Sequence, residues 1–285
     1  MRAVLEFAMR GRRNVIGMAF VCTLLPLLNW FATALIGLVM LRKGPQEALI
    51  VLLWASIPLA LGIYYVGDPS PAIAMIGTVL LAYVLRVSSS WEVTLAVGVV
   101  ISAIGSLIFE FTATELLTTI VEWYMEYTAM MAAQLQQTSE MTFESAKASI
   151  MGFFAMGQAY AMLAFLVLAR WWQSQLYNPG GLRKEFHQIR LSRETSTVVV
   201  VLLLVCFSFS GQLGRWIPLL TVPLFMAALS IVHWMMGVRK MSGQWVFGFY
   251  VLLLVLFQVI YPLLATLAIL DSWFNLRARI QSKEV

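Results

Sequence analysis

The chain has 285 residues, of which 61% are hydrophobic and only 12% are charged, and its mean hydropathy is +0.84. Soluble domains carry about 25% charged residues, so this composition excludes an ordinary soluble domain and indicates a polytopic membrane protein. The formal net charge is +5, and in membrane proteins basic residues concentrate in cytoplasmic loops. We expect a single all-α transmembrane domain over residues 1–285 and no nucleic-acid partner.

The N-terminal segment, residues 1–13, is charged and lacks the apolar core of a cleavable signal peptide. We expect it to lie as a basic segment on the inner membrane surface. The first apolar run, residues 14–41, has 28 residues and would be about 42 Å long as one helix. Pro26 and Asn29 lie near its middle, so one long helix and two arms meeting near Pro26 both remain open on length alone.

The distribution of basic residues decides between these arrangements. With two arms and a cytoplasmic N-terminus, 14 of the 19 basic residues fall in inner loops, and only Lys147 and Arg215 fall in outer loops. With one arm the split becomes 9 inside and 10 outside. Because Lys and Arg favour cytoplasmic loops, the sequence predicts a helical hairpin that turns near Pro26.

Seven further apolar runs follow, and several approach the roughly 20 residues that span a bilayer. Counting the hairpin as two crossings, we expect about nine transmembrane helices. The last run contains Pro262, and a break there would give ten crossings and return the C-terminal tail to the inner side. The seven runs cover residues 46–66, 69–86, 91–111, 147–172, 195–211, 216–237 and 245–270.

Residues 112–146 form the only long outer segment. Its apolar residues recur every three or four positions, which is typical of one face of an amphipathic helix. We expect this helix to rest on the outer surface, either passively or as a lid over a binding cavity. The residues on this face are Leu116, Ile120, Trp123, Tyr127 and Met131.

Residues 174–194 form a basic cytoplasmic loop with the sequence NPGGLRKEFHQIRLSR near its centre. A phosphate-binding P-loop needs a lysine after a glycine, and no lysine in this chain follows a glycine, so residues 178–181 are interpreted as a turn. Leu182, Phe186 and Ile189 then share one helical face, which predicts a surface helix that meets anionic lipid headgroups. The residues proposed to anchor this surface are Trp171, Trp172, Arg183, Lys184, Arg190 and Arg193.

Polar side chains within apolar runs, or at their ends, are candidate ligand-binding groups, because polar groups in hydrocarbon are costly. Seven of them lie toward the outer half in the expected topology, where one cavity could gather them. The alternative is that each is an interfacial residue at a helix end. Gln158 is the strongest single case, since apolar residues surround it. The seven are Asn29, Trp30, Tyr64, Tyr65, Asp68, Glu110 and Gln158.

Three short motifs resemble the YybS-like family of bacterial membrane proteins: EFAMRGRR near the start, LARWWQSQLYNPGG followed by KEF, and LDSWFNLRAR near the end. That family is similar to the substrate-binding S components of energy-coupling-factor transporters. The resemblance implies an S-component-like bundle, a small-ligand cavity open to the outer side, and an ATP-driven module supplied by other chains. Residues 11–25 lack the Ala-x-x-x-Ala face by which S components often contact a transmembrane partner.

Two functions from different classes follow from these observations. The first is a protein of the bacterial inner membrane that binds a small molecule or lipid intermediate, one form of which is a transport subunit without its own ATPase. The second is a non-catalytic scaffold of the cell envelope that contacts another membrane protein. An intramembrane enzyme ranks third, because the sequence contains no HExxH, GxSxG, paired intramembrane aspartates or metal-ligand cluster. We therefore expect no catalytic residue, metal or cofactor.

Overall fold

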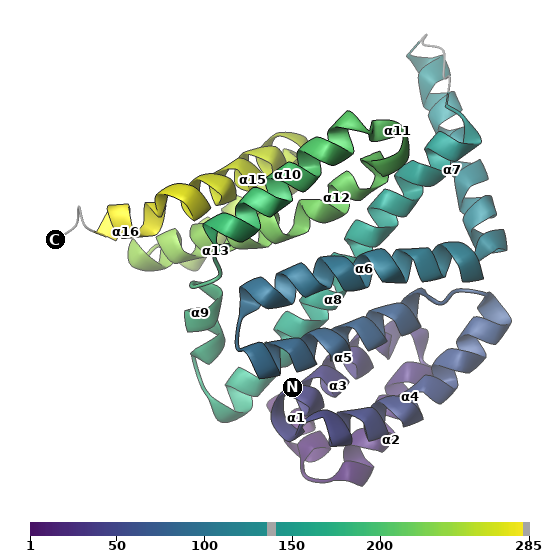
Figure 1. The fold of residues 1–285 in the computed structure, drawn as a ribbon. Helices are drawn as coiled ribbons and strands as arrows, with labels where there is room; N and C mark the ends of the chain where they lie inside the picture. The colour runs from purple at the N-terminus through teal and green to yellow at the C-terminus, as the bar shows by residue number, and fades with distance from the viewer. Residues whose placement is uncertain (136–140, 282–285) are drawn as a thin grey trace.

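The chain folds into a bundle of helices (Figure 1). The computed structural model describes residues 1–135 and 141–281, and this part contains sixteen α-helices, two short 3-10 helices and no strand. Six helical segments in it are long and apolar enough to cross a membrane, so the protein is an all-α chain of the multi-pass membrane class. The six are α4 (Pro45–Val66), α5 (Ser70–Ser88), α6 (Trp91–Thr112), α8 (Phe143–Tyr177), α15 (Phe257–Phe274) and the run Gly214–Val238, which joins η2 (Gly214–Trp216), α12 (Ile217–Leu220) and α13 (Val222–Val238).

The expected break near Pro26 is present. α2 (Arg12–Leu24) is followed by Leu25, whose φ of −99° and ψ of 109° are extended, and α3 (Asn29–Lys43) begins after the 3-10 helix η1 (Pro26–Leu28). α2 packs against both α3 and α4, so the first apolar run forms two contacting helices. With 13 and 15 residues, each arm is only about 20 Å long, shorter than the ~30 Å hydrocarbon core. The count of nine crossings therefore stays a prediction.

The best-buried helices are α3 and α13. Residues 32–41 of α3 and residues 222–232 of α13 are all buried. α3 packs on α5 and α8, and a Cβ on Gly37 would lie 3.2 Å from the Cβ of Ala169 in α8. Small residues at such contacts let membrane helices approach closely. α4, by contrast, lies at the periphery and buries few of its apolar side chains, which leaves that surface to lipid.

The last apolar run turns back on itself near Leu256. α14 (Gly243–Val255) places Tyr250 beside His233, toward the end of α13, with 2.8 Å between Tyr250 Oη and His233 Nε2. α15 places Tyr261 at the opposite end of α13, where its Oη lies 2.6 Å from Thr221 Oγ1. The chain then runs back along α13, so α14 and α15 form a second hairpin (Figure 1).

The structure divides the run 245–270, which the nine-crossing prediction treats as one helix. The ten-crossing alternative predicts the break at Pro262, and that position is wrong, because Pro262 lies inside α15. The residue that interrupts the helix is Leu256, with φ of −112° and ψ of 34°. The hairpin returns the chain to the end of the bundle where α13 ends, and α16 (Leu276–Gln281) lies there. Arg277 of α16 donates to Ile189 O at 2.7 Å, which fixes the tail beside the 174–194 loop.

The two ends of the bundle differ in charge. At one end Arg12 pairs with Glu47, Arg86 Nη1 donates to Leu41 O at 2.6 Å, and the Arg42 guanidinium lies 4.3 Å from the centre of the Tyr177 ring. These contacts unite the starts of α2 and α4 with the ends of α3, α5 and α8. α1 (Arg2–Met9) leads into this end, and α9 (Gly181–Phe186) lies at it (Figure 1). It is called the basic end below, and the opposite end is called the α7 end.

The α7 end is built from α7 (Thr114–Gln134) and a long extension of α8. α8 has 35 residues, about 52 Å, and begins before the predicted run of 147–172. α7 is helical as expected, but the face that it buries contains Leu117 and Val121, while Trp123 of the predicted apolar stripe is 69% exposed. The α8 extension selects that face by packing its own Ala146 and Met151 against it. Residues 136–140 of this segment lie outside the described residues.

Candidate ligand-binding cavity

Two of the seven predicted ligand-binding residues meet at the start of α5. Gln158 of α8 is buried, and its Nε2 donates to Ser70 O at 3.4 Å, while its Oε1 has no partner among the described residues. Asp68 accepts a hydrogen bond from Ser70 N at 2.9 Å and another from Ser70 Oγ. These groups form a small polar cluster between α5 and α8.

The other predicted residues lie apart from this cluster. Tyr64 and Tyr65, at the end of α4, are 81% and 79% exposed and pack edge-to-face on each other. Trp30 is exposed on α3, and Asn29 keeps its Oδ1 buried without a described partner. Five cavities between the described helices are lined by other residues, so none of the five gathers the predicted set.

Glu110, at the end of α6, is held by two cations. Its Oε1 lies 2.9 Å from Lys147 Nζ, and its Oε2 accepts a hydrogen bond from Arg215 Nη1 at 3.1 Å. Lys147 and Arg215 are the two basic residues that the predicted topology assigns to outer loops. The Arg215 guanidinium also lies 4.8 Å from the Trp216 ring centre, a cation–π distance. Glu110 therefore positions Arg215, whose guanidinium carries five N–H donors in all.

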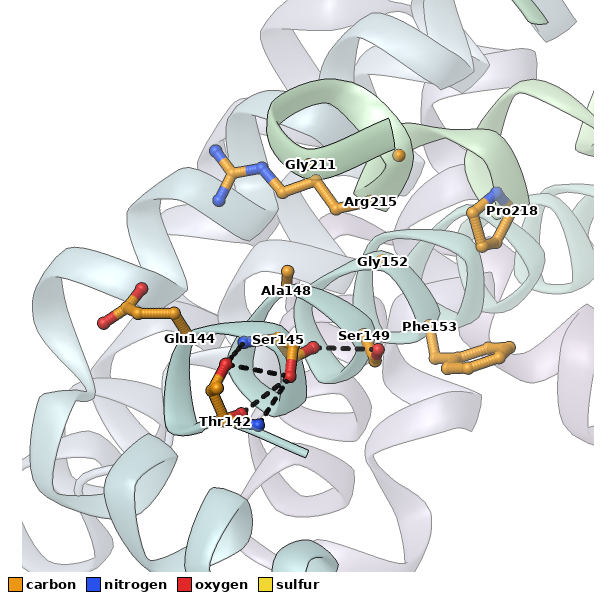
Figure 2. Close-up of a pocket in the computed structure, with 11 residues that line it drawn as sticks. Thr142, Glu144, Ser145, Ala148, Ser149, Gly152, Phe153, Gly211, Arg215 and Pro218 are labelled. Carbon is orange, nitrogen blue, oxygen red and sulfur yellow. Dashed lines mark hydrogen bonds between the residues drawn. The ribbon is translucent and has the colours of Figure 1, made fainter. Parts of the chain in front are cut away.

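A cavity of about 630 Å³ lies at the α7 end beside this ion cluster (Figure 2). It lies between the first turns of α8 and the bend formed by α11 (Ser210–Leu213) and η2, which follows α10 (Arg193–Ser208). The glycines Gly152, Gly211 and Gly214 complete its wall. The polar lining residues are Thr142, Glu144, Ser145, Ser149 and Arg215, and the apolar ones are Ala148, Phe153 and Pro218.

The hydroxyl groups of this cavity come from the start of α8. Thr142 opens the helix with a capping box, in which Ser145 N donates to Thr142 Oγ1 at 3.3 Å and Thr142 N donates to Ser145 Oγ at 3.0 Å. Ser149 Oγ donates to Ser145 O at 2.9 Å. A hydroxyl oxygen has two lone pairs, so these groups retain capacity to accept hydrogen bonds from a ligand.

Gly152 lets the opposite wall approach α8. A Cβ at this position would lie 2.4 Å from the backbone oxygen of Arg215, closer than real side-chain atoms come. The missing side chain therefore allows η2 to lie directly on α8 and brings Arg215 to the cavity. The sequence signal for this site is the run from Gly211 to Arg215, in which two glycines precede an outer-loop arginine. The glycine pair at 180–181, by contrast, does not line this cavity.

The two tryptophans predicted to lie at the membrane interface differ in environment. Trp171 is exposed, as expected, but Trp172 is fully buried, with its ring centre 5.0 Å from that of Phe31 in α3. The interfacial position predicted for Trp172 is wrong, because adjacent residues on a helix point in different directions and α3 covers its side.

The predicted surface helix also ends early. α9 stops at Phe186, and Ile189 is buried in the non-helical segment that follows. Arg190 donates to the backbone oxygens of Asp271 at 2.9 Å and Ser272 at 3.0 Å, so it ties the loop to α15 rather than standing free for headgroups. The other three basic anchor residues are exposed, and their contact with headgroups stays a prediction; they are Arg183, Lys184 and Arg193.

No family model matches the chain, and neither the curated proteins nor the solved structures include a match. The similarity to the YybS-like family thus remains an expectation from three motifs. In the part of the chain that the structure describes, no group of three or more His, Cys, Asp or Glu side chains is arranged to hold a metal ion. The chemistry of the cavity at the α7 end is the remaining indication of function.

Proposed function

We propose that this protein binds an amphiphilic small molecule or lipid intermediate in the cavity at the α7 end. The observation that carries the proposal is the graded lining of that cavity. Figure 2 shows Arg215 and Glu144 on one side and Phe153 and Pro218 on the other. Ligand sites commonly combine an apolar wall with a few placed polar groups, and here the two kinds of group are separated as they are in an amphiphile.

The polar side of the cavity is suited to a ligand headgroup that carries both an anionic oxygen and a hydrogen-bond donor. Arg215 offers N–H donors to the anionic oxygen, and Glu144 accepts from a hydroxyl or amine of the ligand. Ser149 lies between Glu144 and Phe153 (Figure 2). Phe153 is 58% exposed, so the apolar side opens outward, where a hydrocarbon tail can continue into the bilayer.

The location that we propose follows from the charge of the two ends. The basic end carries the loops that the positive-inside rule assigns to the cytoplasm. In a bacterial inner membrane, the N-terminus and the 174–194 loop would then lie on the cytoplasmic side. The cavity then opens on the outer side, as the similarity to S components implies. On this reading the chain is a transport subunit whose ATPase belongs to other chains.

The experiment is to fill the cavity and measure the retained ligand. Ser149→Trp places an indole in the space beside Arg215, and Thr119→Trp places the same group on an exposed face of α7 as the matched control. Native mass spectrometry of the purified protein is expected to show a bound amphiphile in the parent and in the control and none in Ser149→Trp. Equal retention by all three proteins, at equal thermal stability, contradicts the proposal.

The second candidate is a scaffold of the cell envelope, and the exposed stripe on α7 favours it. Trp123 and Tyr127 are exposed on a helix that lies at one end of the bundle, and exposed aromatic residues are common at protein interfaces. Crosslinking from position 123 in cells distinguishes the two functions. A single abundant membrane-protein adduct, together with no ligand in the purified protein, supports the scaffold.

A further inference from the structure

A second cavity, of about 570 Å³, lies at the basic end between α8, α9, α13 and α14. Its lining includes the polar side chains Arg183 of α9 and His187, which follows α9, together with Trp171 of α8 and Val246 and Tyr250 of α14. This cavity is called the basic-end groove below. It shares no residue with the cavity at the α7 end, and the proposed function makes no use of it.

We infer that the basic-end groove binds one anionic phospholipid, with the phosphate on Arg183 and His187 and an acyl chain along Trp171, Val246 and Tyr250. The two polar side chains converge on one point of α13. A Cβ on Gly237 would lie 2.8 Å from His187 Cε1 and 3.5 Å from Arg183 Nη2. Both groups therefore lie at the rim of the groove, near the end of the membrane helix, where a headgroup phosphate sits.

The charge balance at this rim favours an anion. Arg183 forms no ion pair with any acidic residue in the described part of the chain, and the nearby Glu185 is already paired with Arg170. Burial, and after it the charge of Arg183, lowers the pKa of His187 from its ordinary value of 6.5. A phosphate between the two side chains relieves that repulsion and supplies the counter-charge that Arg183 lacks.

The apolar wall favours a lipid over a free phosphate or a soluble anion. α14 buries only Leu253 within the protein, so its outer surface is available to the bilayer on the side next to the groove. Trp171 and Tyr250 are both partly exposed along the groove. Aromatic residues with one apolar and one polar end are typical of the membrane interface. A hydrocarbon chain can therefore pass from the groove into lipid without crossing a polar surface.

The test of the headgroup contact compares two lipids with the same acyl chains. Native mass spectrometry of the full chain is carried out with phosphatidylglycerol and with phosphatidylcholine, and the parent protein is expected to prefer phosphatidylglycerol for the first bound lipid. Arg183→Gln should reduce that preference by about five-fold, since a single basic group at an anionic surface makes a contribution of this size. Arg193→Gln is the matched control, because Arg193 is exposed at the same end but does not line the groove.

The test of the acyl-chain contact uses neighbouring positions on α14. Val246→Trp fills the groove, whereas Phe247→Trp adds the same ring at an exposed position outside it. Val246→Trp is expected to lose the first bound phosphatidylglycerol, and Phe247→Trp is expected to keep it. Lipid binding that is unchanged in Val246→Trp contradicts the site.

Two further outcomes would overturn the inference. Equal losses of preference in Arg183→Gln and Arg193→Gln show that diffuse surface charge attracts the lipid. Displacement of the bound lipid by inorganic phosphate shows a site for a free anion. The Ser149→Trp variant of the α7-end cavity should bind phosphatidylglycerol normally at the groove, so the inference and the proposed function can fail separately.

Discussion

Asp271 is fully buried at the end of α15, and two arginines compensate its charge. Arg277 Nε lies 3.2 Å from Asp271 Oδ2, and Arg190 Nε lies 3.7 Å from the same oxygen. Arg277 also donates to the backbone oxygens of His187 and Ile189. These charged side chains have a structural role, because a buried charge requires partners. The cluster joins the C-terminal hairpin to the loop after α9.

Asp271→Asn is expected to destabilise the protein strongly. The amide keeps the shape of the side chain but removes its charge, and Arg277 remains buried without a counter-ion, a change that costs about 3–5 kcal/mol. Thermal unfolding in detergent measures the loss. Glu6→Gln is the control, because the Arg2–Glu6 pair is exposed to solvent and such pairs contribute little. A midpoint for Asp271→Asn equal to that of the parent would show that the cluster is incidental.

At the scale of single elements, close backbone contacts decide which helices can meet. α8 contains both Gly152, against which the η2 backbone lies, and Gly157, around which no atom lies within 4 Å of an added Cβ. The two glycines belong to the same helix and lie five residues apart, but only one is required by its neighbour. Proline is likewise not decisive by itself, because α15 continues through Pro262 whereas the helix is interrupted at Leu256.

Gly152→Ala is expected to separate η2 from α8 and to lower stability by about 1–3 kcal/mol, the usual cost of overpacking. The added Cβ meets a backbone oxygen at 2.4 Å, and backbone cannot rotate away as a flexible side chain does. Gly157→Ala is the matched control and should be neutral or slightly stabilising, because alanine has the higher helix propensity. Thermal unfolding of the two variants makes the comparison, and equal midpoints would contradict the close contact.

In the molecule as a whole, the two hairpins place both ends of the described chain. The first hairpin turns after Leu25 and the second turns at Leu256, so the start of α2 and the start of the tail both lie at the basic end. Arg277 and Arg279 of the tail thereby join the loops with the predicted inner charge. This arrangement concentrates positive charge at one end more completely than a nine-crossing chain with an outer tail does.

Cysteine labelling in intact cells tests this arrangement. Single cysteines at Gln188, Ala278 and Thr119, in a background without Cys22 and Cys206, report on the loop after α9, the tail and α7. A membrane-impermeant reagent added outside is expected to label position 119 only. Labelling of position 278 together with position 119 would contradict the second hairpin. Labelling of position 188 alone would show that the orientation in the membrane is the reverse of the one proposed.

The candidate site residues show which contacts a sequence pattern can predict and which it cannot. The sequence predicts Glu110 as a ligand-binding residue, and that role stays a prediction. Its partners Lys147 and Arg215 are 37 and 105 residues away in the chain, and periodicity carries no information at that range. The sequence likewise predicts Gln158 but not its partner Ser70. Tyr64 and Tyr65 are predicted because they follow an apolar run, a position that does not separate an exposed helix end from a cavity wall.

Local sequence patterns are sufficient to predict the membrane class, the helical composition, the break near Pro26 and the basic loops, because hydropathy, proline and loop charge act locally and add along the chain. Which helix faces are covered depends instead on contacts between segments that are distant in the chain. Trp172 is buried and Trp171 is exposed, although both read as interfacial, because α3 packs on one of them alone. The cavity at the α7 end likewise exists because η2 lies on Gly152, a contact between segments that no local pattern connects.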